Sequence, residues 1–90
     1  MMTPEALEVL AARLRTEAAR LDWAISSYVD PALRLLPQVW VGPAADRLET
    51  ELIGHRKVLS SVVGRLVARA SSLEDEAIQL RAAEGVAGAV

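Results

Sequence analysis

The apolar residues of this chain recur every three or four positions, in two long stretches separated by one short segment. Such spacing places the apolar side chains of each stretch on one face of an α-helix. The pattern therefore predicts an all-α chain of two amphipathic helices. The first apolar series is Leu7, Leu10, Leu14, Ala18, Leu21, Ile25, Tyr28 and Ala32, and the second is Ala45, Leu48, Leu52, Leu59, Val62, Val63, Leu66, Leu73, Ala77 and Leu80.

Proline and glycine mark the ends of the two predicted helices. Thr3 followed by Pro4 is a typical helix start, because the hydroxyl accepts from free amides and the first position needs no amide partner. Gly42 and Pro43 form a second start, and Gly85 begins a segment that disfavours helix. We therefore expect a single domain over residues 1–90, with helix one over about 4–36, a turn over 37–42, helix two over about 43–84 and a short flexible tail over 85–90.

Two further prolines lie near the end of the first helix. Pro31 removes an amide donor and disfavours helical geometry in Asp30. It is expected to kink the helix, or to end it and restart it with Asp30 as the new cap. Pro37 marks the expected end of this helix.

Each helix also contains a strict seven-residue series, which is typical of a left-handed coiled-coil seam. The series are Leu7, Leu14, Leu21, Tyr28 and Leu35 in helix one, and Ala45, Leu52, Leu59, Leu66, Leu73 and Leu80 in helix two. Folding the chain back at residue 40 makes the two series mirror images, so we predict an antiparallel two-helix hairpin. The predicted contacts pair Leu7 with Leu73, Leu14 with Leu66, Leu21 with Leu59, and Tyr28 with Leu52. A kink at Pro31 or an asymmetric turn would shift this register by one helical turn.

The apolar face of helix two is too wide for one neighbour. It extends from Val58 and Val62 on one flank to Val63 and Val67 on the other, which is about half of the circumference. Ordering each residue costs about 1.5 kcal/mol, so a half-exposed stripe leaves little net stability. We expect a second hairpin to complete a four-helix bundle. The residues expected at this partner interface are Leu14, Leu21, Leu52, Leu59, Val62, Val63 and Leu66.

Charge and composition narrow the possible partners. The 10 basic and 12 acidic residues are interspersed, so no positive field is available to bind nucleic acid. The absence of cysteine excludes disulfides and thiolate chemistry. Apolar segments are shorter than the roughly 18 residues that span a bilayer, so membrane insertion is not expected. A secretory signal begins with a basic segment followed by an apolar one. Glu5 and Glu8 lie in that region here, so we do not expect a cleavable signal.

No residue pattern indicates catalysis or a cofactor. His55 has no second histidine or cysteine at ligand spacing, so we expect a histidine at the edge of the core or at an interface, and no metal. The serines lack a base and an orienting acid, so we do not expect an enzyme.

Glu17 either reaches solvent or pairs with an arginine such as Arg65, Arg69 or one on a partner. Trp23 projects away from the stripe, either as an exposed aromatic or as part of a second contact surface.

The bend carries Trp40, Val41 and Gly42, and helix two opens with "PAADRLETEL". This arrangement resembles the WXG family of ESAT-like proteins associated with type VII secretion, over nearly the whole chain. The resemblance implies a helical hairpin that pairs as a homodimer or heterodimer and is exported folded. Trp40 is expected to cover the end of the seam, and the resemblance implies that it is also presented to a partner or to the export machinery. The alternative is that Trp40 and Gly42 serve the turn alone. Gly42 is expected to permit chain reversal or a close approach of the backbone.

The chain departs from the family pattern in one respect. Members with their own export signal carry a tyrosine four residues before an acid, just after the second helix. Here the only tyrosine is Tyr28, and Ala32 stands at the plus-four position. Either a partner hairpin supplies the signal, or the chain acts as a chaperone or binding protein.

Three functional hypotheses follow. The first is a small non-enzymatic WXG-like protein, secreted by a signal-peptide-independent type VII route as, or together with, a helical-hairpin dimer. The second, which the missing tyrosine motif favours, is a cytoplasmic adaptor that binds a helical targeting segment of a larger secreted toxin. The third is a membrane-active amphipathic hairpin, against which the nearly neutral polar face argues.

Overall fold

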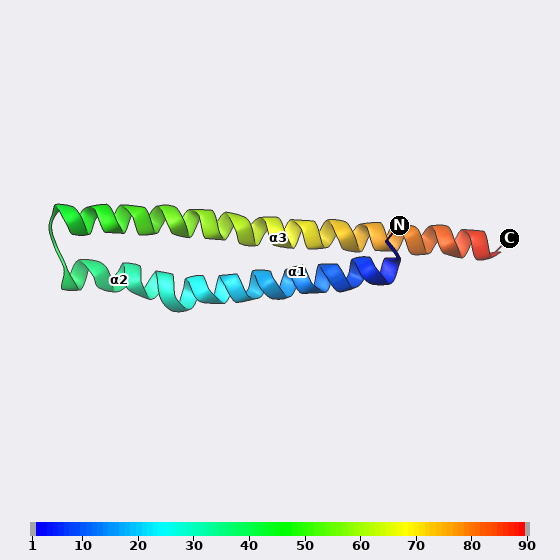
Figure 1. The fold of residues 1–90 in the computed structure, drawn as a ribbon, viewed down its shortest axis with the longest axis horizontal. Helices are drawn as coiled ribbons and strands as arrows, with labels where there is room; N and C mark the ends of the chain where they lie inside the picture. The colour runs from blue at the N-terminus through cyan, green and yellow to red at the C-terminus, as the bar shows by residue number, and fades with distance from the viewer. Residues whose placement is uncertain (1, 90) are drawn as a thin grey trace.

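The chain folds into two antiparallel helical arms joined by one turn (Figure 1). The computed structural model describes the backbone of residues 2–89 and the side chains of residues 2–85. The first arm is nearly continuous, the second is one long helix, and together they form a rod of 73 × 17 × 16 Å. This confirms the predicted all-α antiparallel two-helix hairpin. The elements are α1 (Pro4–Ala24), the wide turn η1 (Ile25–Val29), α2 (Asp30–Val39) and α3 (Pro43–Ala89).

Helix α1 begins where Thr3 and Pro4 predict a start. The Thr3 hydroxyl accepts a hydrogen bond from the Ala6 amide at 3.2 Å, and the Thr3 carbonyl accepts one from the Leu7 amide at 3.1 Å. Thr3 itself is extended, and Pro4 occupies the first turn without leaving an amide unpaired. A capping side chain of this kind stabilises a helix by about 1 kcal/mol.

A π-helical turn, η1, separates α1 from α2. The Asp30 amide donates to the Ile25 carbonyl, five residues back rather than four. Pro31 comes next, and in an ordinary α-helix its ring would clash with the carbonyl of Ser27, four residues earlier. Widening the turn relieves that clash, so the arm continues past Pro31 into α2.

The extra residue in η1 changes the phase of the seam. Before η1 the buried or half-buried positions are spaced alternately by four and three residues. After Ile25 this spacing would make Tyr28 the next buried position, but the half-buried apolar residue is Val29, one position later. Each α-helical residue turns the helix by about 100°, so Tyr28 and Leu35 rotate out of the seam and are 65 % and 55 % exposed. The predicted seam positions of Tyr28 and Leu35, and the contact of Tyr28 with Leu52, are therefore wrong. The observed seam of the first arm is Leu7, Ala11, Leu14, Ala18, Leu21, Ile25, Val29, Leu33 and Leu36.

The most deeply buried cluster lies between the N-terminal half of α1 and the C-terminal half of α3. Its members are Leu7, Ala11, Ala70, Leu73 and Ala77, with Leu14 and Leu80 packed against them. Arg15 pairs with Glu74 and Arg81 pairs with Glu8, so the neighbouring residues Leu14 and Leu73 lie at one level of the rod and Leu7 and Leu80 at another. The predicted contacts of Leu7 with Leu73, Leu14 with Leu66 and Leu21 with Leu59 are therefore wrong by about seven residues of α3, or two helical turns, because the chain reverses beyond residue 40.

Two helix ends differ from the expected boundaries. Pro37 lies inside α2, which continues to Val39. A proline this close to a helix end removes only one of the last backbone hydrogen bonds, which the helix tolerates. Helix α3 continues through Gly85 to Ala89, where we expected a tail to begin, because a single glycine weakens a helix by about 1 kcal/mol without stopping it. Val90 lies outside the described residues.

Candidate interaction surface

One edge of the hairpin is closed by ion pairs between the arms. Arg15 donates to Glu74 through both Nε, at 3.1 Å, and Nη2. Arg81 Nε donates to Glu8 Oε1 at 2.8 Å, and Arg56 pairs with Asp30. Glu8, Arg15 and Asp30 each follow a seam residue by one position, so they lie on the same side of the first arm. We call this side the ion-pair edge, defined by Glu8, Arg15, Asp30, Arg56, Glu74 and Arg81.

The ion pairs of this edge also shift proton affinities. The hydrogen bonds from Arg15, helped by its positive charge, hold the pKa of the Glu74 carboxyl below its usual value, although desolvation acts in the opposite direction. Both side chains are about two-fifths exposed, so solvent screens the pair and its contribution to stability is small. The ion-pair edge thus aligns the arms more than it strengthens them.

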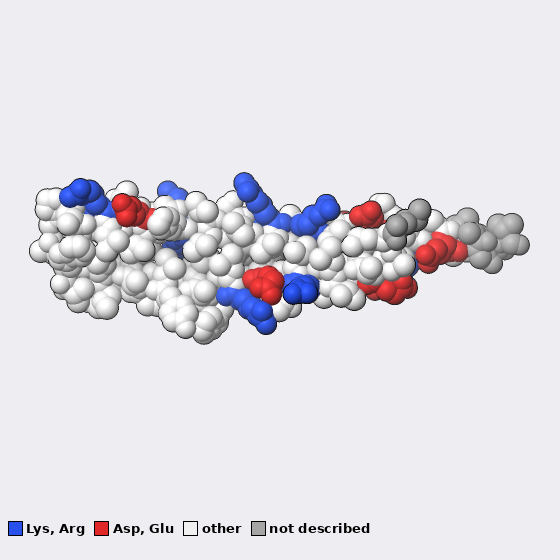
Figure 2. All heavy atoms as spheres, viewed as in Figure 1, with Lys and Arg blue, Asp and Glu red and all other residues white. Residues whose placement is uncertain are grey.

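The opposite edge carries apolar side chains and, among the described residues, no ion pair between the arms. Residues one position before a seam residue lie here. On the face that Figure 2 shows, charged side chains lie along the α3 side of the turn-side half, and the first-arm side of that half is almost free of charge. We call this the open edge, defined by Leu10, Tyr28, Leu35 and Val39 on the first arm and Leu48, Val58 and Val62 on α3.

The open edge is well exposed in the isolated hairpin. Tyr28, Leu35, Val39 and Val58 each expose more than half of their surface. Large apolar patches on a single chain are uncommon and mark contact sites with other molecules. Ile53 and Val67 are also exposed, on the ion-pair edge, but to a smaller extent.

The predicted partner-interface residues fall into two groups. Val62 lies on the open edge and is half-buried. The other six are half-buried along the seam, where each arm covers part of the other. Their remaining surface is what a second chain could contact. These six are Leu14, Leu21, Leu52, Leu59, Val63 and Leu66.

Trp40 and Gly42 form the turn. Trp40 ends α2 with an extended backbone, and its amide donates to the Leu36 carbonyl at 3.0 Å. Its side chain remains 45 % exposed, so it covers the end of the seam only in part. Gly42 has φ of 119°, and a Cβ there would meet no atom within 4 Å. Backbone conformation, not crowding, therefore requires glycine at this position.

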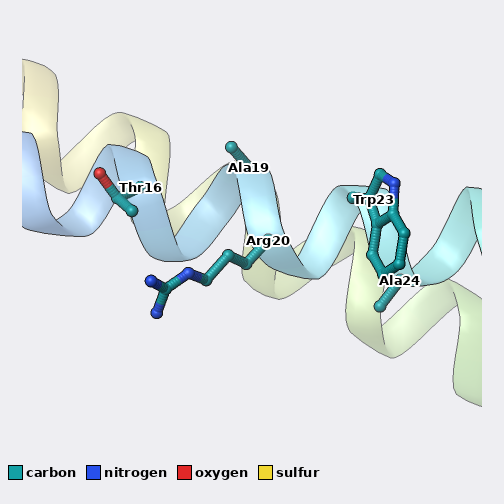
Figure 3. A pocket seen from close by; sticks show the side chains of 5 residues that line it. All are labelled: Thr16, Ala19, Arg20, Trp23 and Ala24. Atoms are coloured by element: carbon teal, nitrogen blue, oxygen red, sulfur yellow. The ribbon is translucent and has the colours of Figure 1, made fainter.

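A second aromatic feature lies on the outer side of α1. The Trp23 ring packs edge-on against Tyr28, with ring centroids 5.5 Å apart. Beside Trp23 lies an open depression of about 620 Å³, lined by residues of α1 alone. Figure 3 shows the Arg20 side chain pointing away from the Trp23 indole ring, with the Ala24 methyl group beside the ring.

The two polar residues singled out from the sequence have simple surroundings. Glu17 accepts a hydrogen bond from Arg20 of its own helix at 3.0 Å, so it pairs with neither Arg65 nor Arg69 within the chain. His55 is exposed beside Val58. Among residues 2–85, no three acidic or histidine side chains come together as a metal site would require. Across the part of the chain described, none of the helices has an apolar run that would span a membrane.

Comparisons with known proteins assign no family. No protein-family description, curated protein or solved structure matches this chain.

Sequence reasoning named Val58 and Val62 as a flank that one neighbour would leave uncovered, but it missed the first-arm residues Tyr28, Leu35 and Val39 of the open edge. Tyr28 and Leu35 continue the seven-residue series, so the pattern placed them in the seam. The only signal for their true position is Pro31, which disturbs the turn before it.

Proposed function

We propose that this chain is a non-enzymatic helical hairpin that pairs with another helical hairpin to form a four-helix bundle, as part of a type VII secretion system. The bundle travels through a route that needs no signal peptide. The open edge is the observation that carries the proposal. The rod formed by the two arms is only 16–17 Å thick, so the apolar side chains of the open edge remain in water. A second pair of helices packed against this edge would cover them.

The turn supports the secretion part of the proposal. Trp40, Val41 and Gly42 lie between the two arms, at the same place as the motif of WXG-like hairpins that they resemble. Trp40 and Val41 are both exposed at the end of the rod. A large aromatic at an exposed tip is suited to recognition by another protein.

Pairing is tested by measuring mass in solution. The chain is purified alone and together with the products of neighbouring genes, and each sample is examined by light scattering after size exclusion. We expect a homodimer or a complex with a neighbouring hairpin or larger protein. A folded monomer that binds none of these products would refute the proposal.

Export is tested in the native host. The chain should appear in the medium of cells with an intact type VII system and remain in cells whose secretion ATPase is deleted. Equal amounts outside both strains, with a cytoplasmic marker retained, would contradict type VII export.

A cytoplasmic adaptor is the second candidate. It is favoured by the position of the only tyrosine, Tyr28, which lies in η1 with Ala32 four residues later. An adaptor would hold a helical targeting segment of a larger secreted protein against the open edge. In the export experiment, it would remain in the cells while its cargo reached the medium.

A further inference from the structure

One row of side chains along α3 is complementary to itself. Glu51, Val58 and Arg65 are seven residues apart, so they lie in line, with each charge about 10 Å from Val58. All three are exposed, Val58 to 62 %. Among the described residues, neither Glu51 nor Arg65 takes part in an ion pair. Opposite charges thus stand at equal distances on the two sides of an exposed apolar residue.

The surface around Val58 shows the same complementarity in shape. Gly54 lies one turn before Val58, and Val62 lies one turn after it. A Cβ at Gly54 would meet no atom within 4 Å, so the surface there can receive a side chain. A shallow hollow of about 310 Å³, lined by His55, Val58 and Leu59, opens at the same level.

We propose that this row binds a second copy of the chain, with the two α3 helices antiparallel about a two-fold axis at Val58. The axis brings Glu51 to the partner's Arg65, and Arg65 to the partner's Glu51. It also places Val58 against its own copy and Val62 opposite the partner's Gly54. The inference rests on the proposed pairing function and names the partner that the function leaves open.

Charge decides the relative direction of the two helices. If the α3 helices ran parallel, Glu51 would face another Glu51 and Arg65 another Arg65, and like charges in contact oppose association. In the antiparallel arrangement both pairs attract. The row ends in Arg47 and Arg69, which face each other across the axis. Arg47 and Arg69 each lie about 16 Å along α3 from Val58. Helices that cross at about 20° have separated at this distance from the axis, which keeps the two like charges apart.

The position of Val58 also fixes the shape of the dimer. Val58 lies about 22 Å from the start of α3 and roughly 46 Å from its end, at 1.5 Å per residue. The two hairpins then overlap from the turn to about residue 73 of each α3, and the remainder of each rod extends beyond its partner. The dimer is about 95 Å long by the same helix geometry, compared with 73 Å for one hairpin.

Cysteine cross-linking tests the axis directly, because the chain has no cysteine of its own. In Val58→Cys the two thiols meet at the axis, so mild oxidation should join most of the chains into covalent dimers. Ser60→Cys is the matched control, since it lies at nearly the same level on the ion-pair side. Equal cross-linking of the two variants would overturn the inference.

Charge reversal tests the pairing by a second measurement. Glu51→Arg or Arg65→Glu alone should raise the dimer dissociation constant about tenfold, because two attractive pairs become repulsive. The double variant exchanges the charges and should restore the original constant. Sedimentation equilibrium gives the constants, circular dichroism verifies helix content, and small-angle scattering should give a maximum dimension of about 95 Å.

The remaining outcomes separate this inference from the proposed function. A homodimer that neither cross-links through position 58 nor responds to reversal pairs by another face, which overturns the inference alone. A chain that is a monomer by itself but binds a hairpin encoded by a neighbouring gene also overturns the inference alone. A monomer that binds nothing overturns both.

Discussion

At the scale of single residues, small side chains and unusual backbone angles decide where the arms can approach and turn. Ala11 and Ala70 are fully buried at 0 % exposure and let the two helices come close in the core cluster. Gly42 takes a positive φ that other residues avoid. Such positions tolerate fewer substitutions than the exposed leucines and valines nearby.

Gly42→Ala should destabilise the hairpin by about 1–2 kcal/mol, since the alanine Cβ is strained at positive φ. Gly64→Ala is the control. Gly64 lies within α3 with free space around it, so alanine there should stabilise by up to about 1 kcal/mol. Urea unfolding followed by circular dichroism measures both. Equal effects of the two substitutions would show that the turn is not strained.

Ala11→Leu should destabilise the fold by about 1–3 kcal/mol, because the close contact of α1 and α3 leaves no room for the added carbons. Ala12→Leu adds the same atoms to the exposed neighbouring position and should change stability by less than about 0.5 kcal/mol. The two variants are compared by thermal unfolding. If they unfold together, the helices are not in close contact at this level.

At the scale of elements, the two arms are aligned by a seam and one charged edge, and η1 decides what lies on the other edge. The seven-residue series of α1 and α3 is visible in the sequence, and it predicts the antiparallel hairpin but not its register. The open edge could not be predicted in the same way. One additional residue in η1, placed against Pro31, moves Tyr28 and Leu35 from the seam to the surface, and a fixed heptad does not reveal such an insertion.

The ion-pair edge should make stability depend on acid. The lowered pKa of Glu74 means that its contribution is complete above the ordinary carboxylate pKa of about 4.3. It is lost as the pH falls through the lower pKa of the folded state. Glu74→Gln should therefore lose less stability than the native chain between pH 6 and pH 2, measured as the change in melting temperature. Asp75→Gln is the control, because Asp75 is exposed and makes no ion pair among the described residues. Equal acid dependence of the native chain and Glu74→Gln would contradict this role.

At the scale of the whole molecule, a thin rod exposes more apolar surface than its own arms can cover. Few residues in a rod 16–17 Å thick are fully enclosed, and the core is small. Association that covers the open edge stabilises the folded state by mass action, so stability should rise with concentration.

The melting temperature should therefore increase as the chain is concentrated from micromolar to near-millimolar levels. Leu35→Gln, on the open edge, should reduce this dependence. Ile78→Gln should not, although Ile78 is about equally exposed on α3. A melting temperature that is independent of concentration in the native chain would show that the open edge stays in water.

The sequence by itself determined the helices, their antiparallel pairing and the location of the turn, because periodic apolar residues, proline and glycine act locally. The tertiary structure decided which apolar residues remain outside. Burial depends on the rotational phase between two packed helices, and one wide turn resets that phase for every residue beyond it. The sequence therefore indicated the flank at Val58 and Val62, but the place of Tyr28 and Leu35 on the same edge became visible only when both arms were placed side by side.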